Sequence, residues 1–130
     1  MNTPVSFELA KLLKEKEIYI PAFHYYENEV LKEPYLENGS STDIEFRVEL
    51  SDLKEYFNKW SKKISATTIT EVVMWLYEKH GIWIYAHRID QKEFYWSIDT
   101  DKKEFTSGEN FKTPTEAYEA AIEYTLKNLL

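Results

Sequence analysis

A chain of 130 residues without cysteine must rely on a packed core, because disulfide bonds, thiolate catalysis and Cys-based metal sites are all excluded. The formal charge of −7 opposes the counterion release that supplies most nucleic-acid affinity, so direct binding to DNA or RNA is disfavoured. No stretch approaches the ~20 apolar residues that cross a bilayer, and the N-terminal sequence lacks a signal-peptide pattern, which together favour a cytoplasmic protein.

The first segment has the pattern of an amphipathic helix followed by an irregular aromatic stretch. Thr3 places a capping hydroxyl ahead of Pro4 at the first helical position, and apolar residues recur at helical spacing as far as Leu13. This pattern predicts a helix over about residues 4–16. Prolines interrupt the stretch that follows, which predicts a loop or a short strand around Phe23–Tyr26.

The middle of the chain predicts a loop, a strand and a helix. The sequence ENGSSTD at 37–43 is typical of a loop. Apolar and charged residues alternate over 44–50, which predicts a half-buried strand. Ser51 then stands at a capping position, and the apolar residues after it fall within one narrow arc of a helix. The second helix is therefore predicted over about 52–64.

The next segment predicts a helix and a hairpin. Thr68 and Glu71 have the spacing of a capping box ahead of an apolar stripe, and Gly81 stands where a helix needs a left-handed terminator. A third helix is predicted between these signals. The stretches 82–89 and 93–99 are rich in β-branched and aromatic residues around a short polar turn, which predicts an antiparallel hairpin.

The chain ends in turn chemistry and a capped helix. The sequence DTDK at 99–102 predicts a turn, after which a third short strand is expected near 103–106. Thr113 and Pro114 combine a cap with a first-position proline, so a last helix is predicted over about 114–129. This order of elements is typical of the α+β class, with a small antiparallel sheet of about three to four strands packed against three to four helices. We predict that the whole chain, residues 1–130, forms a single domain.

Three segments resemble a known group of proteins: TPVSFELAKLLKEKE at 3–17, ATTITEVVMWLYEKHGIWI at 66–84 and FKTPTEAYEAAIEYTLKNL at 111–129. They are similar to uncharacterised small phage-like or mobile-element proteins of gut Bacteroidetes. The motifs that carry the resemblance are helix caps and core stripes, so no catalytic or ligand-binding residues are carried over. The resemblance implies a bacterial or phage-derived accessory protein that acts in the host cytoplasm.

Few residues suggest a chemical centre. The histidines lack the spacing of metal ligands: His24, His80 and His87. Three acids near the predicted turn lack the glycine and the full ligand set of an EF-hand, which favours a solvated turn: Asp99, Asp101 and Glu104. The three glycines lie far apart, which excludes a phosphate-binding loop, and no serine stands in a strand-to-helix elbow. We therefore expect no enzymatic activity, no metal and no cofactor.

The predicted hairpin has two faces, because alternate side chains of a strand point the same way. One face should lie under the helices: Ile82, Ile84, Ala86, Phe94, Trp96 and Ile98. The other carries a group of rings, which we name as the candidate partner-binding residues: Trp83, Tyr85, His87 and Tyr95. An open aromatic face is typical of a stacking platform or a protein-binding patch. The alternative is that segment 18–65 covers these rings as a second core layer.

We expect a non-enzymatic module that binds another protein or a second copy of itself. One alternative is an acidic decoy that occupies the DNA-binding site of a host enzyme, because dense carboxylates present a phosphate-like field. Another is a divergent domain of the double-stranded-RNA-binding kind, suggested by the helix, sheet and helix of the second half. The last helix, however, opens with TPTEAYEA, where such domains place lysines. The sequence leaves the partner and the oligomeric state open.

Overall fold

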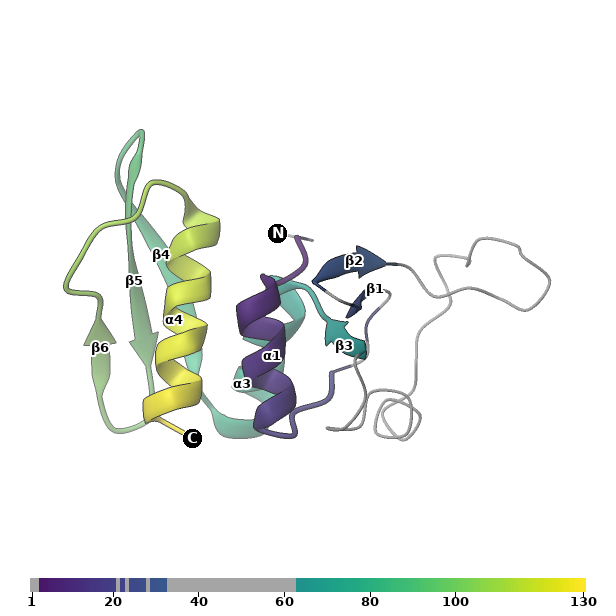
Figure 1. The fold of residues 1–130 in the computed structure, drawn as a ribbon. Coiled ribbons are helices and arrows are strands. Elements are labelled where there is room, and N and C mark those ends of the chain that lie inside the picture. The colour runs from purple at the N-terminus through teal and green to yellow at the C-terminus, as the bar shows by residue number, and fades with distance from the viewer. Residues whose placement is uncertain (1–2, 21, 23, 28, 33–62) are drawn as a thin grey trace. The chain divides into compact units, whose positions relative to one another are not determined.

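The computed structural model divides into two compact units, Pro4–Thr68 and Ile69–Leu130 together with Met1–Thr3. The described residues are 3–20, 22, 24–27, 29–32 and 63–130 (Figure 1). The predicted loop at 37–43, the predicted strand at 44–50 and most of the predicted helix at 52–64 lie outside the described residues. That the chain forms a single domain stays a prediction.

The unit Pro4–Thr68 combines one helix with a sheet of three short antiparallel strands in the order β2-β1-β3. Its elements are α1 (Phe7–Glu15), β1 (His24–Glu27), β2 (Val30–Lys32) and β3 (Lys63–Ala66). Tyr26 ties the start of α1 to β1. Its hydroxyl donates a hydrogen bond to the carbonyl oxygen of Val5 at 2.7 Å, and its ring packs edge-on against Phe7 at 5.6 Å.

The predicted start of the first helix was wrong. The helix begins at Phe7, and Ser6 is its cap, with Ser6 Oγ accepting a hydrogen bond from the amide of Leu9 at 3.3 Å. Pro4 instead forms an antiparallel bridge with Thr68, and the amide of Val5 donates to Thr67 O at 2.9 Å. These pairings hold the backbone before Ser6 extended, so Thr3 and Pro4 cannot belong to the helix.

The predicted end of the second helix was also wrong, because residues 63–64 belong to β3. This strand pairs with β1 in a register that runs from His24 opposite Ala66 to Glu27 opposite Lys63. Of the loop and the short strand that were predicted as alternatives around Phe23–Tyr26, the strand is confirmed as β1, whereas β2 was not predicted.

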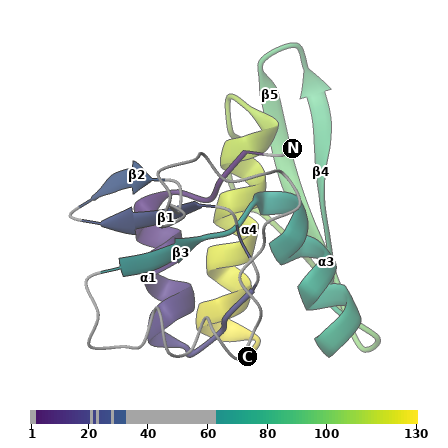
Figure 2. The ribbon, with the colours of Figure 1, turned by 90° about the vertical axis from the view of Figure 1, so that its right-hand side faces the viewer.

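The unit that begins at Ile69 contains two helices and a second antiparallel sheet, in the order β4-β5-β6. Its elements are α3 (Ile69–His80), β4 (Trp83–Asp90), β5 (Glu93–Asp99), β6 (Glu104–Thr106) and α4 (Pro114–Asn128). Figures 1 and 2 show α4 lying along one face of this sheet. The α+β class, the third helix, the hairpin, the third strand and the last helix are therefore confirmed.

Local signals explain where α3 ends and where α4 begins. Gly81 has a φ of 66°, the left-handed conformation that glycine adopts without steric cost, so α3 ends as predicted. Thr113 is the cap of α4, and its hydroxyl accepts a hydrogen bond from the amide of Glu116 at 3.1 Å. The Glu116 carboxylate accepts a hydrogen bond from the amide of Lys112 at 3.3 Å. This bond satisfies a backbone N–H group that precedes the first turn of α4.

The face of the sheet beneath α4 forms a core. Ile84 and Ile98 are essentially fully buried, and the ring of Trp96 packs against Tyr124 of α4 with centroids 5.2 Å apart. Phe105 of β6 reaches the same tyrosine at 5.9 Å. The predicted apolar face of the hairpin is thus confirmed, and α4 is the helix that covers it.

Truncation of this core should cost far more stability than truncation of the same side chain on the surface. We expect Ile98→Ala to lower the free energy of unfolding by about 2–5 kcal/mol, because Ile98 has 0% exposure and its loss leaves a cavity. Ile89→Ala is the matched control, since Ile89 lies in the same hairpin at 52% exposure. Urea denaturation of both variants measures the difference, and equal losses would contradict this account of the core.

Candidate functional site

The face of the β4-β5-β6 sheet that points away from α4 is called the outer face. Its side chains alternate with those of the core, because successive residues of a strand point to opposite sides. The pairing of the three strands arranges the outer face in three rows: Trp83–Asp99–Glu104, Tyr85–Ser97–Thr106 and His87–Tyr95. All four rings named from the sequence therefore lie on one face, in neighbouring positions.

Three of these rings form a connected cluster. The His87 ring stacks on Tyr95 with centroids 4.5 Å apart and 11° between the planes, while Tyr85 meets the same imidazole edge-on at 4.4 Å. A hydrogen bond of 2.9 Å joins His87 Nε2 and Ser97 Oγ. Ser97 is only 1% exposed, so its hydroxyl is covered. The three rings are half-buried and hold one another in place.

Trp83 is the most accessible of the four predicted residues, at 41% exposure. Its indole packs edge-on against Tyr77 of α3 at 5.4 Å, and Tyr77 is itself exposed. Ile89 is also exposed, at the irregular pairing between Arg88 and Asp90 where β4 approaches the hairpin turn. Apolar and aromatic surface therefore extends along much of β4.

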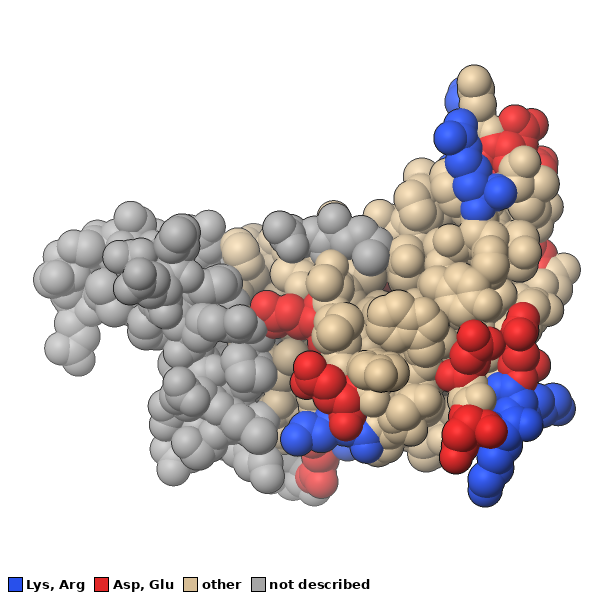
Figure 3. Space-filling view, turned by 180° about the vertical axis from the view of Figure 1, so that it is seen from behind, with Lys and Arg blue, Asp and Glu red and all other residues tan. Residues whose placement is uncertain are grey.

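Charged side chains lie at the two ends of the outer face and leave its middle free of charge. Figure 3 views the molecule from behind, and over the sheet it shows uncharged atoms between a group of charged residues at the hairpin end and another at the opposite end. The hairpin end carries Asp90, Lys92 and Glu93, and the other end carries Asp99, Asp101, Lys102 and Glu104. An uncharged centre with a charged border is the usual anatomy of a protein-binding surface.

The hydroxyl of Tyr85 lies near negatively charged side chains. Its pKa is raised above the ordinary value, first by partial burial and then by the negative charge of Asp99, with Glu104 acting in the same direction. Ser97, which stands opposite Tyr85 in the same row, acts on the pKa in the opposite direction. Tyr85 therefore connects the ring cluster to the two carboxylates of the first row.

The contact between His87 and Ser97 was not predicted, and it raises the question of nucleophilic chemistry. A serine nucleophile needs an adjacent base, an orienting partner for that base and access to a substrate. Ser97 is almost completely covered, and within the described residues no carboxylate or carbonyl contacts the other nitrogen of His87. This geometry favours a structural role, in which the hydroxyl fixes the orientation of the imidazole.

The structure separates the other candidates of the sequence. His80 lies in the last turn of α3, as expected, and its ring also packs edge-on against Trp75 at 5.2 Å. His24 belongs to β1 in the other unit. Within the described part of the chain, no three or more histidine and acidic side chains converge as a metal site would require.

The predicted turn after Asp99 is confirmed, and Asp99 and Glu104 flank it. They end β5 and begin β6, directly opposite each other, and the turn itself comprises the residues between them. Thr100 organises that turn, because its Oγ1 accepts hydrogen bonds from the amides of Lys102 and Lys103 at 3.3 and 3.0 Å. The two acids are thereby fixed as a cross-strand pair on the outer face.

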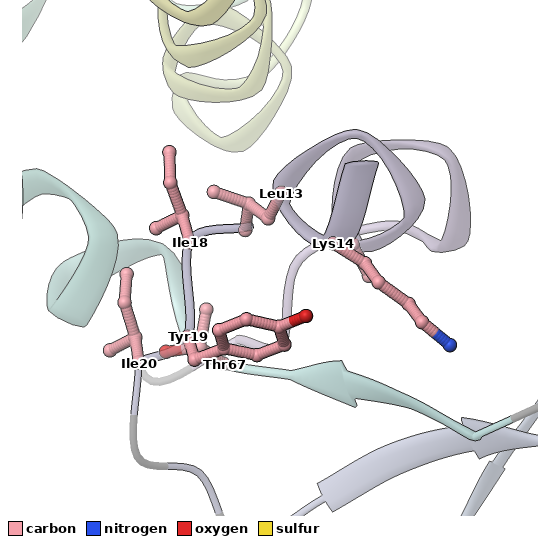
Figure 4. Close-up of a pocket in the computed structure, with 7 residues that line it drawn as sticks. Leu13, Lys14, Ile18, Tyr19, Ile20 and Thr67 are labelled. Carbon is pink, nitrogen blue, oxygen red and sulfur yellow. The ribbon is translucent and has the colours of Figure 1, made fainter. Parts of the chain in front are cut away.

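The unit Pro4–Thr68 contains a small pocket beside α1. Figure 4 shows it, lined by Ala10, Leu13, Lys14, Ile18, Tyr19, Ile20 and Thr67. Burial lowers the pKa of Lys14, and burial together with Glu17 raises the pKa of Tyr19. The pocket offers about 10 Å³, roughly the space of one water molecule. It is too small for a substrate, and in Figure 4 the Lys14 amine points away from Leu13 and Ile18.

The chain matches no protein-family model, no curated protein and no solved structure. None of the helices in the described residues is both long enough and apolar enough to span a membrane. The outer face of the β4-β5-β6 sheet is therefore the candidate site on the strength of its own geometry.

The environment of Tyr85 can be tested by titration. We expect its phenol to ionise above the ordinary pKa of about 10, and Asp99→Asn to lower that pKa because it removes the negative charge that contributes most to the rise. The difference in absorbance between the wild-type protein and Tyr85→Phe isolates this phenol from the other tyrosines. Glu109→Gln is the control, because it removes an exposed charge elsewhere.

The same shift has a consequence for stability. The folded state raises the pKa of Tyr85 and therefore favours its neutral phenol. The resulting stabilisation of the fold is fully present when the pH is below the pKa of Tyr85 in the unfolded chain. This stabilisation is lost as the pH rises through the pKa of Tyr85 in the folded protein.

An Asp99→Asn titration that coincides with that of the wild type would contradict this description of the outer face.

Proposed function

We propose that this protein is a non-enzymatic protein-interaction module whose contact surface is the outer face of the β4-β5-β6 sheet. The observation that carries the proposal is the gathering of Trp83, Tyr85, His87 and Tyr95 on one face of a single sheet. Aromatic side chains are enriched in the centres of protein interfaces, where they supply large apolar area at a small entropic cost.

The roles of the rings follow from their exposure. Trp83, at 41% exposure, has surface left to lose on binding, and tryptophan is the residue type most often found as an energetic centre of an interface. Tyr95 and His87 form a stacked pair on the same face as Trp83. The charged groups at the two ends of the sheet would then form the polar rim.

We further propose that the module is an accessory protein of phage or mobile-element origin that acts in the bacterial cytoplasm. The support for this origin is the resemblance carried by residues 3–17, 66–84 and 111–129. The partner in this proposal is another protein or a second copy of the chain.

The charge pattern of the described residues gives less support to the two alternatives. A decoy of DNA needs dense carboxylates without interleaved cations, whereas Asp101 is followed directly by Lys102 and Lys103. An RNA-binding role needs basic groups for phosphates, and the first turn of α4 carries Glu116 instead. Protein binding needs neither pattern.

The proposal predicts that truncation of the rings abolishes partner capture without unfolding the protein. We expect Trp83→Ala combined with Tyr95→Ala to weaken partner binding by at least about 30-fold, the effect of losing about 2 kcal/mol at an interface centre. Pull-down from host lysate with the immobilised protein identifies the retained partner, and sedimentation velocity detects a second copy.

Met74→Ala is the matched control for this test, because Met74 is 40% exposed on α3 and lies outside the outer face. It should retain whatever the wild-type protein retains. The proposal fails if the wild type is a strict monomer that captures nothing, or if the ring variant captures the same partner as the control.

A further inference from the structure

The first row of the outer face holds an arrangement that the proposed function alone does not require. Asp99 and Glu104 stand directly opposite each other on adjacent antiparallel strands. Side chains in such positions have Cβ atoms roughly 4.5–5.5 Å apart, and like charges placed there repel. Within the described residues, no lysine, arginine or histidine forms an ion pair with either carboxylate. The folded protein therefore maintains an uncompensated pair of negative charges.

The basic residues nearest in sequence do not compensate this pair. The Lys103 amine lies over the ring of Phe105, 5.1 Å from its centroid, and Phe105 faces Tyr124 of α4 on the opposite side of the sheet. Lys102 is exposed in the turn. The polar group nearest in the strand register is the hydroxyl of Tyr85 in the next row, whose pKa the charges of Asp99 and Glu104 raise.

An aromatic plane completes the row. Trp83 is paired with Asp99 across β4 and β5, and its indole is 41% exposed. A guanidinium group stacks on an indole more favourably than an ammonium group does, and its fork of N–H donors matches two carboxylate oxygens. The row thus offers one ring for stacking and two carboxylates for charge-assisted hydrogen bonds.

We infer that the row Trp83–Asp99–Glu104 binds an arginine side chain of the protein partner, stacked on the indole and held by the two carboxylates. This inference rests on the proposed function and names the chemistry of the partner surface that fits it. The overall charge of −7 would favour the approach of a cationic partner.

A divalent metal is the competing occupant, and the geometry favours it less. Calcium takes six to eight oxygen ligands and magnesium keeps near-octahedral geometry, whereas this row supplies two carboxylates beside an indole. The described residues contain no convergent group of three or more metal-ligating side chains. An exposed tryptophan next to the acids has no role in such a site, but it has one in binding a guanidinium.

The probes for the test are hexa-arginine and hexa-lysine peptides, with binding followed by calorimetry. We expect the wild-type protein to bind hexa-arginine more tightly than hexa-lysine. Asp99→Asn combined with Glu104→Gln should weaken binding of hexa-arginine by about tenfold or more, because both acceptors of the fork are lost. The control combines Glu78→Gln with Glu109→Gln, which removes the same charge from exposed positions outside the row.

Each outcome decides the inference. Equal weakening by the two double variants shows attraction by net charge only and overturns it, as does an absence of peptide binding. Trp83→Ala should reduce the preference for arginine over lysine, and an unchanged preference also overturns the inference. Calcium binding that disappears in Asp99→Asn combined with Glu104→Gln, without peptide binding, assigns the row to a metal instead. The proposed function fails separately, when the ring variant of the pull-down still retains its partner.

A stability measurement separates a binding role from a structural one. If the carboxylate pair exists to hold a cation, Glu104→Gln should raise the urea midpoint of the free protein because it relieves the repulsion. The same substitution should weaken binding of hexa-arginine. A lower midpoint would mean that Glu104 stabilises the fold and would count against the inference.

Discussion

The packing of α4 on one side of β5 is the constraint from which the outer face follows. Trp96 and Ile98 are two residues apart, both are buried, and Trp96 contacts Tyr124 of the helix. A shift of the strand by one residue would turn both side chains away from α4, so the hydrophobic core sets the register. Once that register is set, Tyr95, Ser97 and Asp99 must point the other way. The arrangement of the candidate site is therefore a by-product of core packing.

Much of this fold could be predicted because capping and alternation are local signals. Thr113 and Pro114 identify the start of α4 from three or four neighbouring residues, and Gly81 marks the end of α3 in the same way. The start of α1 escaped prediction because Pro4 pairs with Thr68, which lies far away in the sequence. Two capping hydroxyls precede that helix, and only the long-range pairing decides that Ser6 is the cap. Residues 63–64 became part of β3 for a similar reason, because their partners are in β1.

The candidate site was predictable in part. Alternation along two strands was enough to place Trp83, Tyr85, His87 and Tyr95 on one face. It could not bring His87 to Ser97, because that contact depends on which residues of β4 and β5 stand opposite each other. Nor could it bring Asp99 to Glu104, since a turn organised by Thr100 decides where β6 begins. Contacts between strands depend on the register of pairing, which the residue pattern of each single strand does not determine.

The covered hydroxyl of Ser97 has a consequence for the thermodynamics of the proposed partner binding. Because it is bonded to His87, which in turn contacts Tyr85 and Tyr95, these rings have already lost rotamer freedom when the chain folds. A surface ordered in advance gives up little additional entropy when it meets its target, so more of the contact energy is available as affinity. Recognition here would resemble the docking of a rigid template, and the ordering would fall mainly on the other molecule.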